Sequence, residues 1–407
     1  MHTSSRGGLA SLSLSMLLAA LGTSIANVGL PSLVKAFDAS FHAVQWVVLA
    51  YLMAITLVIV SAGRLGDRLG RRRLLLAGLL LFALACGLCS AAPTLNGLIA
   101  ARALQGLGAA VMMAMALGMV GDTVPPERTG RAMGLLGTLS AVGTALGPSV
   151  GGGLVSLWGW RALFLAGAPL GLAAFVLAWR CLPLDRRNGR LPAQAGFWRA
   201  LEDASLRSRL VMSALVSAVI MATFVVGPFY LSQGLGLAPE WMGLAMAVGP
   251  CVAALTGVPA GRLTDRLGSR HTTFAGLGTL LGGALLLALA SGLPAYLGSL
   301  VILTAGYSLF QTANNTAVMK AARGTNRGTL SGWLNLSRNL GLIGGASALG
   351  TVFAWATPDV THGTPQSVAD GLHTTFGVAA GLILLALAIA RGRVNSPQHA
   401  NIDKLKS

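Results

Sequence analysis

Long apolar runs constrain this chain more than any other feature of its sequence. About twelve stretches of roughly 20 mostly apolar residues follow one another with short polar gaps, and each is long enough to cross a bilayer as a helix. The chain has 54% hydrophobic and 10% charged residues and a mean hydropathy of +0.71, so as a water-soluble protein it would lack the polar residues to cover its surface. The sequence therefore predicts an all-α integral membrane protein.

The predicted spans fall into two sets of six, with boundaries uncertain by about two to four residues. The first set covers residues 9–32, 43–62, 74–92, 95–121, 131–156 and 162–182. The second set covers residues 210–232, 240–260, 272–291, 295–320, 329–356 and 372–391. This pattern predicts a six-helix bundle over 1–182, a cytoplasmic linker over 183–209, and a second six-helix bundle with a short cytoplasmic tail over 210–407.

A repeated stretch supports this division. Residues 62–78 read AGRLGDRLGRRRLLLAG, and residues 260–276 read AGRLTDRLGSRHTTFAG, so 11 of 17 positions are identical. The offset of 198 residues is about half of the 407-residue chain. The sequence therefore predicts a doubled unit, with the two bundles related by a pseudo-twofold repeat.

The basic residues indicate the orientation, because cytoplasmic loops hold the excess of Lys and Arg. If the N-terminus is cytoplasmic, 25 of the 29 Lys and Arg residues fall on that side, while Lys35 and Arg161 fall outside and two lie within spans. The formal net charge of +17 therefore indicates topology and membrane-surface phosphates, not nucleic acid. We expect a multi-pass protein of the cell (inner) membrane with both termini in the cytoplasm.

Several other features narrow the classes of function. Residues 9–32 lack a small-residue cleavage site, so we expect a retained span instead of a signal peptide. A short amphipathic helix is predicted near 197–206 of the linker. Cys86 and Cys89 lie in an apolar run without a second pair, which favours packing over zinc or redox chemistry. No Gly is followed by Lys, so a P-loop is excluded; no cofactor and no metal are expected.

The repeated stretch connects two predicted spans in each half. Glycines at 63, 66 and 70 allow a tight turn, and Asp67 offers a carboxylate to neighbouring cations or to a helix N-terminus. A short cytoplasmic turn would explain these residues on its own. Their recurrence at 261, 265, 266 and 268 favours a latch between cytoplasmic helix ends.

Together these residues resemble the major facilitator superfamily, whose signature loop G-x-L-x-D-R-x-G-R-R is matched throughout by residues 63–72. The resemblance covers nearly the whole chain and implies two six-helix bundles, a central cavity and alternating access. It also implies that the loop helps to hold the cytoplasmic side shut in the outward-facing state. The gating residues implied by this resemblance are Gly63, Asp67, Arg68, Gly70, Arg71 and Arg72, with Asp265 and Arg266 as a weaker second copy.

Two further stretches narrow the branch of the family. RALQGLGAA at 102–110 looks like the family's fourth-helix motif, and GTALGPSVGGG at 143–153 looks like the fifth-helix motif of its antiporters. Gly143, Gly147 and Gly151 recur every fourth residue, so they share a face that allows close helix approach, and Pro148 bends or loosens the helix. We assign these four residues to gating; ordinary small-residue packing is the alternative.

The stretches LGTSIANVGLPSL at 21–33 and LFQTANNTAVM at 309–319 resemble multidrug and metabolite exporters of the drug:proton antiporter type. The chain departs from that branch at Gly22, where many members carry an aspartate. No Asp, Glu or His lies in the predicted membrane interior, so the obvious proton carrier is missing. Proton coupling therefore rests on the resemblance. Two routes remain open: a carboxylate at the cytoplasmic edge, which would be Asp67, Asp122 or Asp265, or a proton carried by water or by the substrate.

Two arginines lie inside predicted spans, where each costs roughly 2.5 to 3.5 kcal/mol unless it is compensated. Arg102 either is satisfied by backbone groups and Gln105 or contacts substrate. Arg338, flanked by Asn335 and Asn339, either lines the cavity or snorkels toward the cytoplasm. Neither arginine can face lipid without this free-energy cost.

Uncharged polar side chains complete the predicted cavity, because unpaired polar groups are unfavourable inside spans. With positive and no negative interior charge, the cavity should admit neutral or anionic solutes better than multivalent cations. The predicted cavity residues are Asn27, Tyr51, Arg102, Gln105, Gln311, Asn314, Asn315, Asn335 and Arg338. Among the uncharged ones, Asn27, Gln311, Asn314 and Asn315 are the strongest candidates.

These features predict a secondary exporter of a drug-like compound or metabolite, with alternating access and proton antiport. The expected partners are a small-molecule substrate, protons and the lipid bilayer, and the chain is expected to act as a monomer. A uniporter or importer of a sugar or organic acid is the alternative. A non-transporting sensor or intramembrane enzyme is disfavoured, since the interior lacks His, Asp and Glu and no segment is long enough for an output domain.

Overall fold

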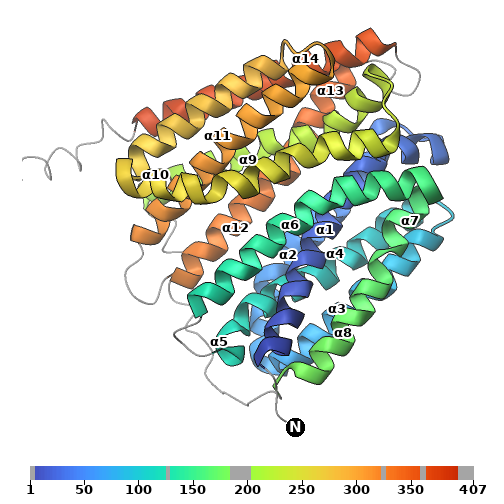
Figure 1. Ribbon diagram of the computed structural model, residues 1–407, viewed down its shortest axis with the longest axis vertical. Coiled ribbons are helices and arrows are strands. Elements are labelled where there is room, and N and C mark those ends of the chain that lie inside the picture. The colour runs from blue at the N-terminus through green and yellow to red at the C-terminus, as the bar shows by residue number, and fades with distance from the viewer. Residues whose placement is uncertain (1–4, 125–128, 184–202, 322–326, 358–363, 393–407) are drawn as a thin grey trace, which may run out of the picture. The chain divides into compact units, whose positions relative to one another are not determined.

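The computed structural model describes residues 5–124, 129–183, 203–321, 327–357 and 364–392, and these residues form helices and short connections without a strand (Figure 1). Ten of the described helices are long and apolar enough to cross a membrane. One of them, Pro239–Leu287, contains two of the predicted spans, and Thr129–Trp158 supplies the remaining one. The predicted all-α membrane fold with its twelve spans is therefore confirmed.

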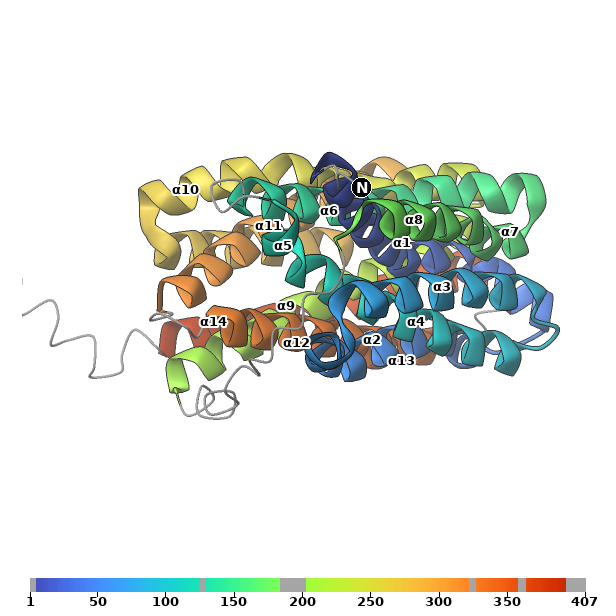
Figure 2. The same ribbon diagram turned by 90° about the horizontal axis from the view of Figure 1, so that it is seen from below.

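The helices of the first half of the chain match the first six predicted spans, the last of which divides into two helices. They are α1 (Ser5–Phe37), α2 (Phe41–Leu69), α3 (Arg71–Ala91), α4 (Leu95–Gly118), the short α5 (Val120–Thr123), α6 (Thr129–Trp158), α7 (Trp160–Leu165) and α8 (Gly167–Cys181). Within this set α3 packs on both α4 and α8, as Figure 2 shows.

The second half contains longer helices, two of which continue into π-helical turns. They are α9 (Ala204–Phe229) with η4 (Tyr230–Gly234), α10 (Pro239–Leu287), α11 (Gly292–Ala321), α12 (Arg327–Gly344) with η6 (Gly345–Leu349), α13 (Gly350–Ala356) and α14 (Pro365–Gly392). The linker segment 197–206, where a short helix is predicted, lies mostly outside the described residues.

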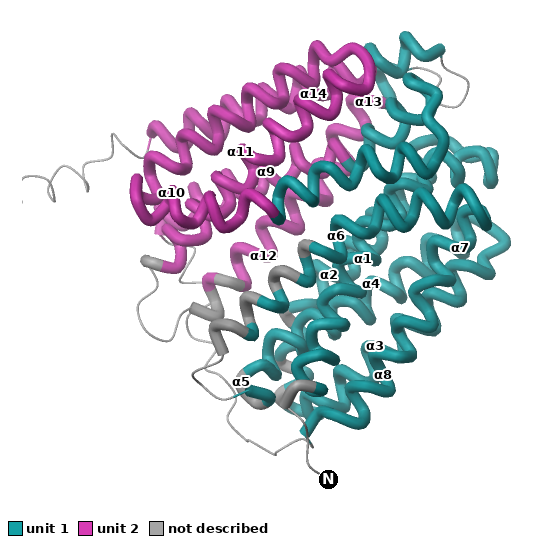
Figure 3. Tube along the Cα trace, in the orientation of Figure 1, with its two compact units in different colours: residues 1–192, 224–254, 354–370 teal, residues 193–223, 255–353, 371–407 magenta. Residues whose placement is uncertain are grey.

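The chain divides into two compact units (Figure 3). Unit 1 contains residues 1–192, 224–254 and 354–370, and unit 2 contains residues 193–223, 255–353 and 371–407. Each unit therefore combines segments that are distant in sequence. The division into bundles at 182 and 210 remains a proposal.

The helices expose large apolar side chains. Leu57, Leu255 and Leu289 are 72%, 77% and 78% exposed, and further exposed leucines, valines and tryptophans occur along the helices. A water-soluble monomer rarely exposes so many large apolar side chains. Contact with lipid tails accounts for this exposure.

The sequence repeat has a counterpart in helix packing. In unit 1, α3 and α4 cross at glycines, so that a Cβ added to Gly108 would lie 2.9 Å from the carbonyl oxygen of Gly78. In unit 2, α10 and α11 cross at Gly276 and Gly306, each 198 residues later, and a Cβ added to Gly306 would lie 2.9 Å from the Gly276 oxygen. The same backbone contact is therefore built in both copies.

A second pair of crossings follows the same rule. Gly143 of α6 lies against the backbone of Leu17 in α1, and Gly341 of α12 lies against the backbone of Ala214 in α9. Gly143 and Gly341 are again 198 residues apart. In each copy a side chain at this glycine would collide with the facing backbone, so glycine sets the spacing of the two helices.

The turn predicted from Gly63, Gly66 and Gly70 involves fewer residues than expected. Helix α2 continues to Leu69, so Gly63 and Gly66 are helical, and Gly70 alone breaks the helix with φ 98°. Its counterpart Gly268, with φ 80°, is the single non-helical residue inside α10. One residue in a conformation that only glycine adopts readily is enough to end one helix and start the next. Gly66 instead makes room for Met115 of α4.

Replacing Gly70 by alanine should destabilise the protein by about 1 to 2 kcal/mol, because alanine at positive φ is strained. Gly63→Ala is a matched control, since Gly63 is helical and no atom lies within 4 Å of an added Cβ. That control should be neutral or stabilising. Thermal unfolding in detergent would measure both, and equal midpoints for the two variants would contradict this account of the turn.

Candidate functional site

Arg102 forms the centre of a closed polar cluster in unit 1. Its side chain is fully buried, and each guanidinium nitrogen donates a hydrogen bond. Nε donates to the Val47 oxygen at 2.9 Å, Nη2 donates to the Gly22 oxygen at 3.1 Å, and Nη1 donates to Oε1 of Gln105. The arginine of α4 thereby ties α1 and α2 together.

Aromatic rings and a second tier of hydrogen bonds complete this cluster. The guanidinium lies 4.1 Å from the ring centroid of Tyr51, where a cation–π interaction stabilises the charge. The Tyr51 hydroxyl donates to the Ala19 oxygen at 2.8 Å, and Nε2 of Gln105 contacts Sγ of Cys86 at 3.0 Å. Three predicted cavity residues, Tyr51, Arg102 and Gln105, are thus brought together with their polar groups partnered.

Gly22, the position of the missing aspartate, lies against this cluster. A Cβ added to Gly22 would lie 2.7 Å from Oη of Tyr51 and 3.4 Å from the Phe82 ring. A side chain there would have to displace the buried tyrosine. In this chain the Gly22 carbonyl, instead of a carboxylate, is the acceptor that α1 offers to Arg102.

Asn27 lies farther along α1 and is 2% exposed. Its Nδ2 donates to the oxygens of Thr23 and Ser24 at 3.2 Å each, while its buried Oδ1 has no partner among the described residues. One free acceptor therefore remains in unit 1 at a predicted cavity residue.

The remaining predicted cavity residues lie in unit 2. Gln311, Asn314 and Asn315 share one face of α11 at i, i+3 and i+4, and Asn314 is fully buried. Nδ2 of Asn314 donates to the Arg209 oxygen of α9 at 3.3 Å. The amide oxygens of all three side chains are buried without a partner in the described part of the chain.

Arg338 and Asn335 lie on α12, both partly buried. Helix α12 is joined to α9 by Ser337, whose hydroxyl donates to the Leu210 oxygen. Nε of Arg338 is buried and unpartnered in the described structure. The two intramembrane arginines therefore have opposite environments, although the sequence presents them alike.

Sequence reasoning missed two serines of α9. Ser213 and Ser217 are both fully buried, and their hydroxyls make no hydrogen bond among the described residues. Their spacing of four residues in an apolar helix is the signal that could have found them, since it places both on one face.

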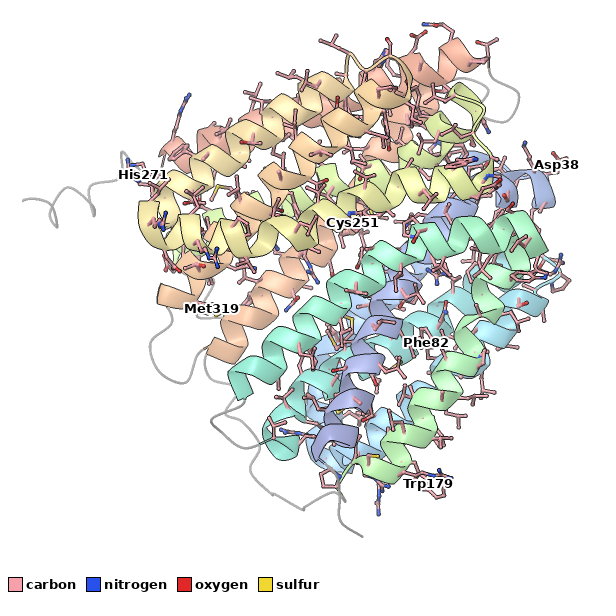
Figure 4. The ribbon with its side chains drawn as sticks, in the orientation of Figure 1. Asp38, Phe82, Trp179, Cys251, His271 and Met319 are labelled. Atoms are coloured by element: carbon pink, nitrogen blue, oxygen red, sulfur yellow. The ribbon has the colours of Figure 1, made fainter. Side chains whose placement is uncertain are left out.

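The predicted gating loop is anchored inside unit 1. Nη1 of Arg71 donates to the Gly118 oxygen at the end of α4 at 2.8 Å. Nη2 of Arg72 donates to the oxygen of Trp179, which lies near the end of α8 and is labelled in Figure 4. Cationic side chains are favourable at helix C-termini, where carbonyls lack partners. Arg68 is exposed, and the side chain of Asp67 lies outside the described atoms. In unit 2, Asp265 and Arg266 are exposed.

The predicted glycine face of α6 packs on α1. Added Cβ atoms on Gly147 and Gly151 would meet Ser24 and Val28 of α1, and the nearest of these contacts for Gly151 would be 2.7 Å. The close approach expected from the spacing is therefore present. Pro148 is buried within the same helix.

A neighbouring glycine, which the sequence did not single out, faces a different helix. A Cβ added to Gly152 of α6 would lie 3.0 Å from Cα of Gly243 in α10, and one added to Gly243 would lie 2.9 Å from Cα of Gly152. The oxygens of Pro148 and Pro239 lie still closer to these positions. Within unit 1, α6 thus packs by glycine on two helices.

Comparison with known proteins gives consistent results. A family model described as Major Facilitator Superfamily matches residues 12–346. Riboflavin transporter RibZ of Clostridioides difficile (strain 630) is 28% identical over 389 residues, covering 83% of this chain and 84% of the relative. Multidrug efflux pump LfrA of Mycolicibacterium smegmatis (strain ATCC 700084 / mc(2)155) is 27% identical over 454 residues, covering 96% and 90%. A crystal structure of a bacterial homologue of the human lysosomal transporter Spinster has a TM-score of 0.82 at 17% identity, covering 96% of this chain and 97% of that one.

Proposed function

Because this chain belongs to the major facilitator superfamily, we propose that it is a secondary exporter that moves a small organic solute across the cell membrane by alternating access. Protons are the proposed counter-ion. The compared proteins are transporters and not enzymes, and the relatives include a multidrug efflux pump and a riboflavin transporter. Those names support a drug-like compound or a metabolite as the solute.

The observation that carries the proposed alternating access is the packing of α6. This helix holds the stretch that resembles the antiporters of the family, and its glycines meet α1 on one face and α10 on another. Contacts made of backbone atoms can form and separate without repacking side chains. Such a helix suits the rocking that alternating access requires, so we assign Gly143, Gly147, Pro148 and Gly151 to gating.

The loop residues Gly63, Asp67, Arg68, Gly70, Arg71 and Arg72, with Asp265 and Arg266, are proposed to steady the cytoplasmic helix ends. The bonds of Arg71 and Arg72 to the ends of α4 and α8 support this role. We propose further that both termini are cytoplasmic and that the protein acts as a monomer. The proposed substrate contacts are Asn27 within unit 1 and, separately, the polar groups of α11 and α12 within unit 2. The Arg102 cluster is proposed to support α1, α2 and α4 of unit 1.

One observation favours a second candidate, a uniporter. Arg102 is fully partnered, and the predicted membrane interior contains no carboxylate or histidine that could carry a proton. Proton antiport would then use Asp67, Asp122 or Asp265 at the cytoplasmic edge, or a proton carried by water or by the substrate. A pH gradient contributes about 1.4 kcal/mol per unit only to a transporter that moves protons.

Inverted membrane vesicles separate these two mechanisms. Riboflavin, ethidium and benzoate, added one at a time to energised vesicles, test a neutral, a cationic and an anionic solute. For the solute that is transported, we expect proton release together with solute uptake, and Asp67→Asn should reduce both. Arg262→Gln, a change at an exposed arginine, is the matched control.

The outcomes have distinct meanings. Uptake that collapses the pH gradient supports the antiporter. Uptake without proton movement, together with counterflow in the absence of a gradient, overturns the antiport mechanism in favour of the uniporter. If none of the three solutes crosses faster than in vesicles without the protein, the proposal that the chain exports such compounds is wrong.

A further inference from the structure

Unit 2 holds buried polar atoms that make no hydrogen bond among the described residues. They belong to three helices and are the hydroxyls of Ser213 and Ser217, the amide oxygens of Gln311, Asn314 and Asn315, and Nε of Arg338. Leaving such groups unpaired is unfavourable, and the penalty is greater for a charged group. Unit 1 also holds such atoms, on Ser13, Asn27, Gln233 and Glu240. The set in unit 2 differs because its helices are joined by the bonds of Asn314 and Ser337 to α9, and this arrangement calls for an explanation.

The Arg102 cluster shows that the fold can satisfy polar groups inside apolar helices. There the guanidinium has a partner for each nitrogen and an aromatic ring beneath it. Unpaired groups in unit 2 are therefore not an unavoidable result of placing an arginine in a span. We interpret their hydrogen-bonding capacity as reserved for a molecule that binds there.

Helix directions bring these groups to one level. Helices α9 and α12 run in the same direction, because Ser337 meets Leu210 and Gly345 meets Ala218 eight residues farther along both helices. Helix α11 precedes α12 across residues 322–326 and runs opposite to both (Figure 1).

The bond from Asn314 to Arg209 then sets the register of α11 against α9. One turn farther along the pair, Gln311 comes level with Ser213. Arg338 follows directly after Ser337, which is bonded to Leu210. The unpaired groups thus occupy about two helical turns of three packed helices.

The unpaired atoms specify the chemistry of the ligand. The amide oxygens of Gln311, Asn314 and Asn315 accept hydrogen bonds and cannot donate them, so they require N–H or O–H groups on the ligand. For Asn314 this orientation is set by its Nδ2 bond to α9. Arg338 is a cationic donor and pairs best with an anion. The sequences of α9, α11 and α12 contain no Asp or Glu that would attract a cation.

We infer that α9, α11 and α12 form a binding site in unit 2 for a solute with several O–H or N–H donors and one anionic group, such as a hydroxylated acid. This inference rests on the proposed transport function and narrows its substrate class. Arg338 binds the anionic group, Gln311, Asn314 and Asn315 accept from the donor groups, and Ser213 and Ser217 bond to either. A lipophilic cation without N–H or O–H groups finds no complementary group among these atoms, and the charge of Arg338 repels it.

Three related probes test each part of the site separately. The probe 3,5-dihydroxybenzoate carries both features, benzoate lacks the hydroxyl donors, and resorcinol lacks the acid. Binding of each to the purified full chain would be measured by titration calorimetry, with tetraphenylphosphonium, which has no N–H or O–H donor, as the lipophilic cation. We expect 3,5-dihydroxybenzoate to bind at least about 10-fold more tightly than either simpler probe, since two kinds of hydrogen bond are added.

Two variants assign the contacts. Arg338→Gln should weaken 3,5-dihydroxybenzoate about 10-fold or more while leaving resorcinol unchanged, and Asn314→Leu combined with Gln311→Leu should weaken 3,5-dihydroxybenzoate while leaving benzoate unchanged. Arg262→Gln, at an exposed arginine of α10, is the control for loss of a positive charge. The unfolding temperature of every variant is measured alongside, and binding is compared only between variants that remain folded.

Tighter binding of tetraphenylphosphonium than of the hydroxylated acid would overturn the inference. Absence of binding of that acid, or equal losses for the acid and resorcinol in folded Arg338→Gln, would overturn it as well. Export of ethidium together with such a result would leave the proposed exporter intact. Binding with the expected selectivity but without any solute flux would contradict the proposed transport function, while the inferred binding site would still be supported.

Discussion

Replacing Arg102 by alanine is expected to unfold the protein or to lower its stability by several kcal/mol. Truncating a large buried side chain leaves a cavity, for which about 2 to 5 kcal/mol is typical. Oε1 of Gln105 would also lose its donor, at about 1 to 3 kcal/mol. With native stabilities of about 5 to 15 kcal/mol, such a loss is a large share of the total.

The direct comparison is with Arg338, the other arginine inside a span. Arg338→Met removes a charge whose buried Nε has no partner, so stability should stay the same or rise. The stability of Arg102→Lys should fall between that of wild type and that of Arg102→Ala, because one ammonium group cannot make the three differently directed hydrogen bonds of the guanidinium. Unfolding temperature in detergent and the amount of folded protein in the membrane measure all three variants. Equal losses for Arg102→Ala and Arg338→Met would refute the difference between these environments.

Replacing Gly152 by valine is expected to abolish most transport by forcing α6 away from α10. An added Cβ would lie 3.0 Å from Cα of Gly243 and closer still to the Pro239 oxygen, and backbone atoms cannot rotate out of the way. We expect transport to fall at least about 10-fold, which corresponds to 1.4 kcal/mol against the closed contact. Gly153→Val is the matched control, because no atom lies within 4 Å of a Cβ at the next residue.

A cysteine near this contact would report its opening. Ala247, one turn beyond Gly243 on α10, is 8% exposed, so Ala247→Cys should react slowly with a membrane-impermeant maleimide. The background would carry Cys181→Ser and Cys251→Ser, since Cys86 and Cys89 are fully buried. Gly152→Val should accelerate labelling, and Gly153→Val should not. Unchanged labelling and normal transport in Gly152→Val would show that the contact plays no part in gating.

Much of the fold could be predicted because a chain can cross a lipid bilayer in only a few kinds of secondary structure. Apolar runs of the right length predict helices, and the repeat supports the same division, so most helix ends lie within a few residues of the predicted bounds. The exceptions include α2, which ends at Leu69 instead of residue 62, and α14, which begins at Pro365 instead of residue 372. The turn after α2 was predicted less well. Glycine at 63, 66 and 70 reads alike in sequence, and only the backbone shows that Gly70 reverses the chain while Gly66 makes room for Met115.

The candidate site was predictable in its residue types but not in its pairing. Polar residues are easily recognised within apolar runs of the sequence, which is why Arg102 and Arg338 were both predicted to be functional. Whether an arginine finds a hydrogen-bond acceptor depends on its neighbours in the folded protein, such as the carbonyls of Val47 and Gly22. Backbone carbonyls are present at every residue, so the sequence does not show which of them will be close. Gly152 and Gly243 were missed for the same reason, because a backbone contact between helices distant in sequence leaves only two unremarkable glycines.

The matching glycine crossings also determine where this chain can change its length. Gly70, Gly108 and Gly147 of the first copy each have a partner 198 residues later, so no net insertion or deletion separates the two copies across that region. One added residue inside α4 or α6 would rotate every later position by about 100° and turn its glycines away from the facing backbone. Fusion tags and inserted domains therefore belong between the two copies, where an added residue leaves the register within each copy unchanged.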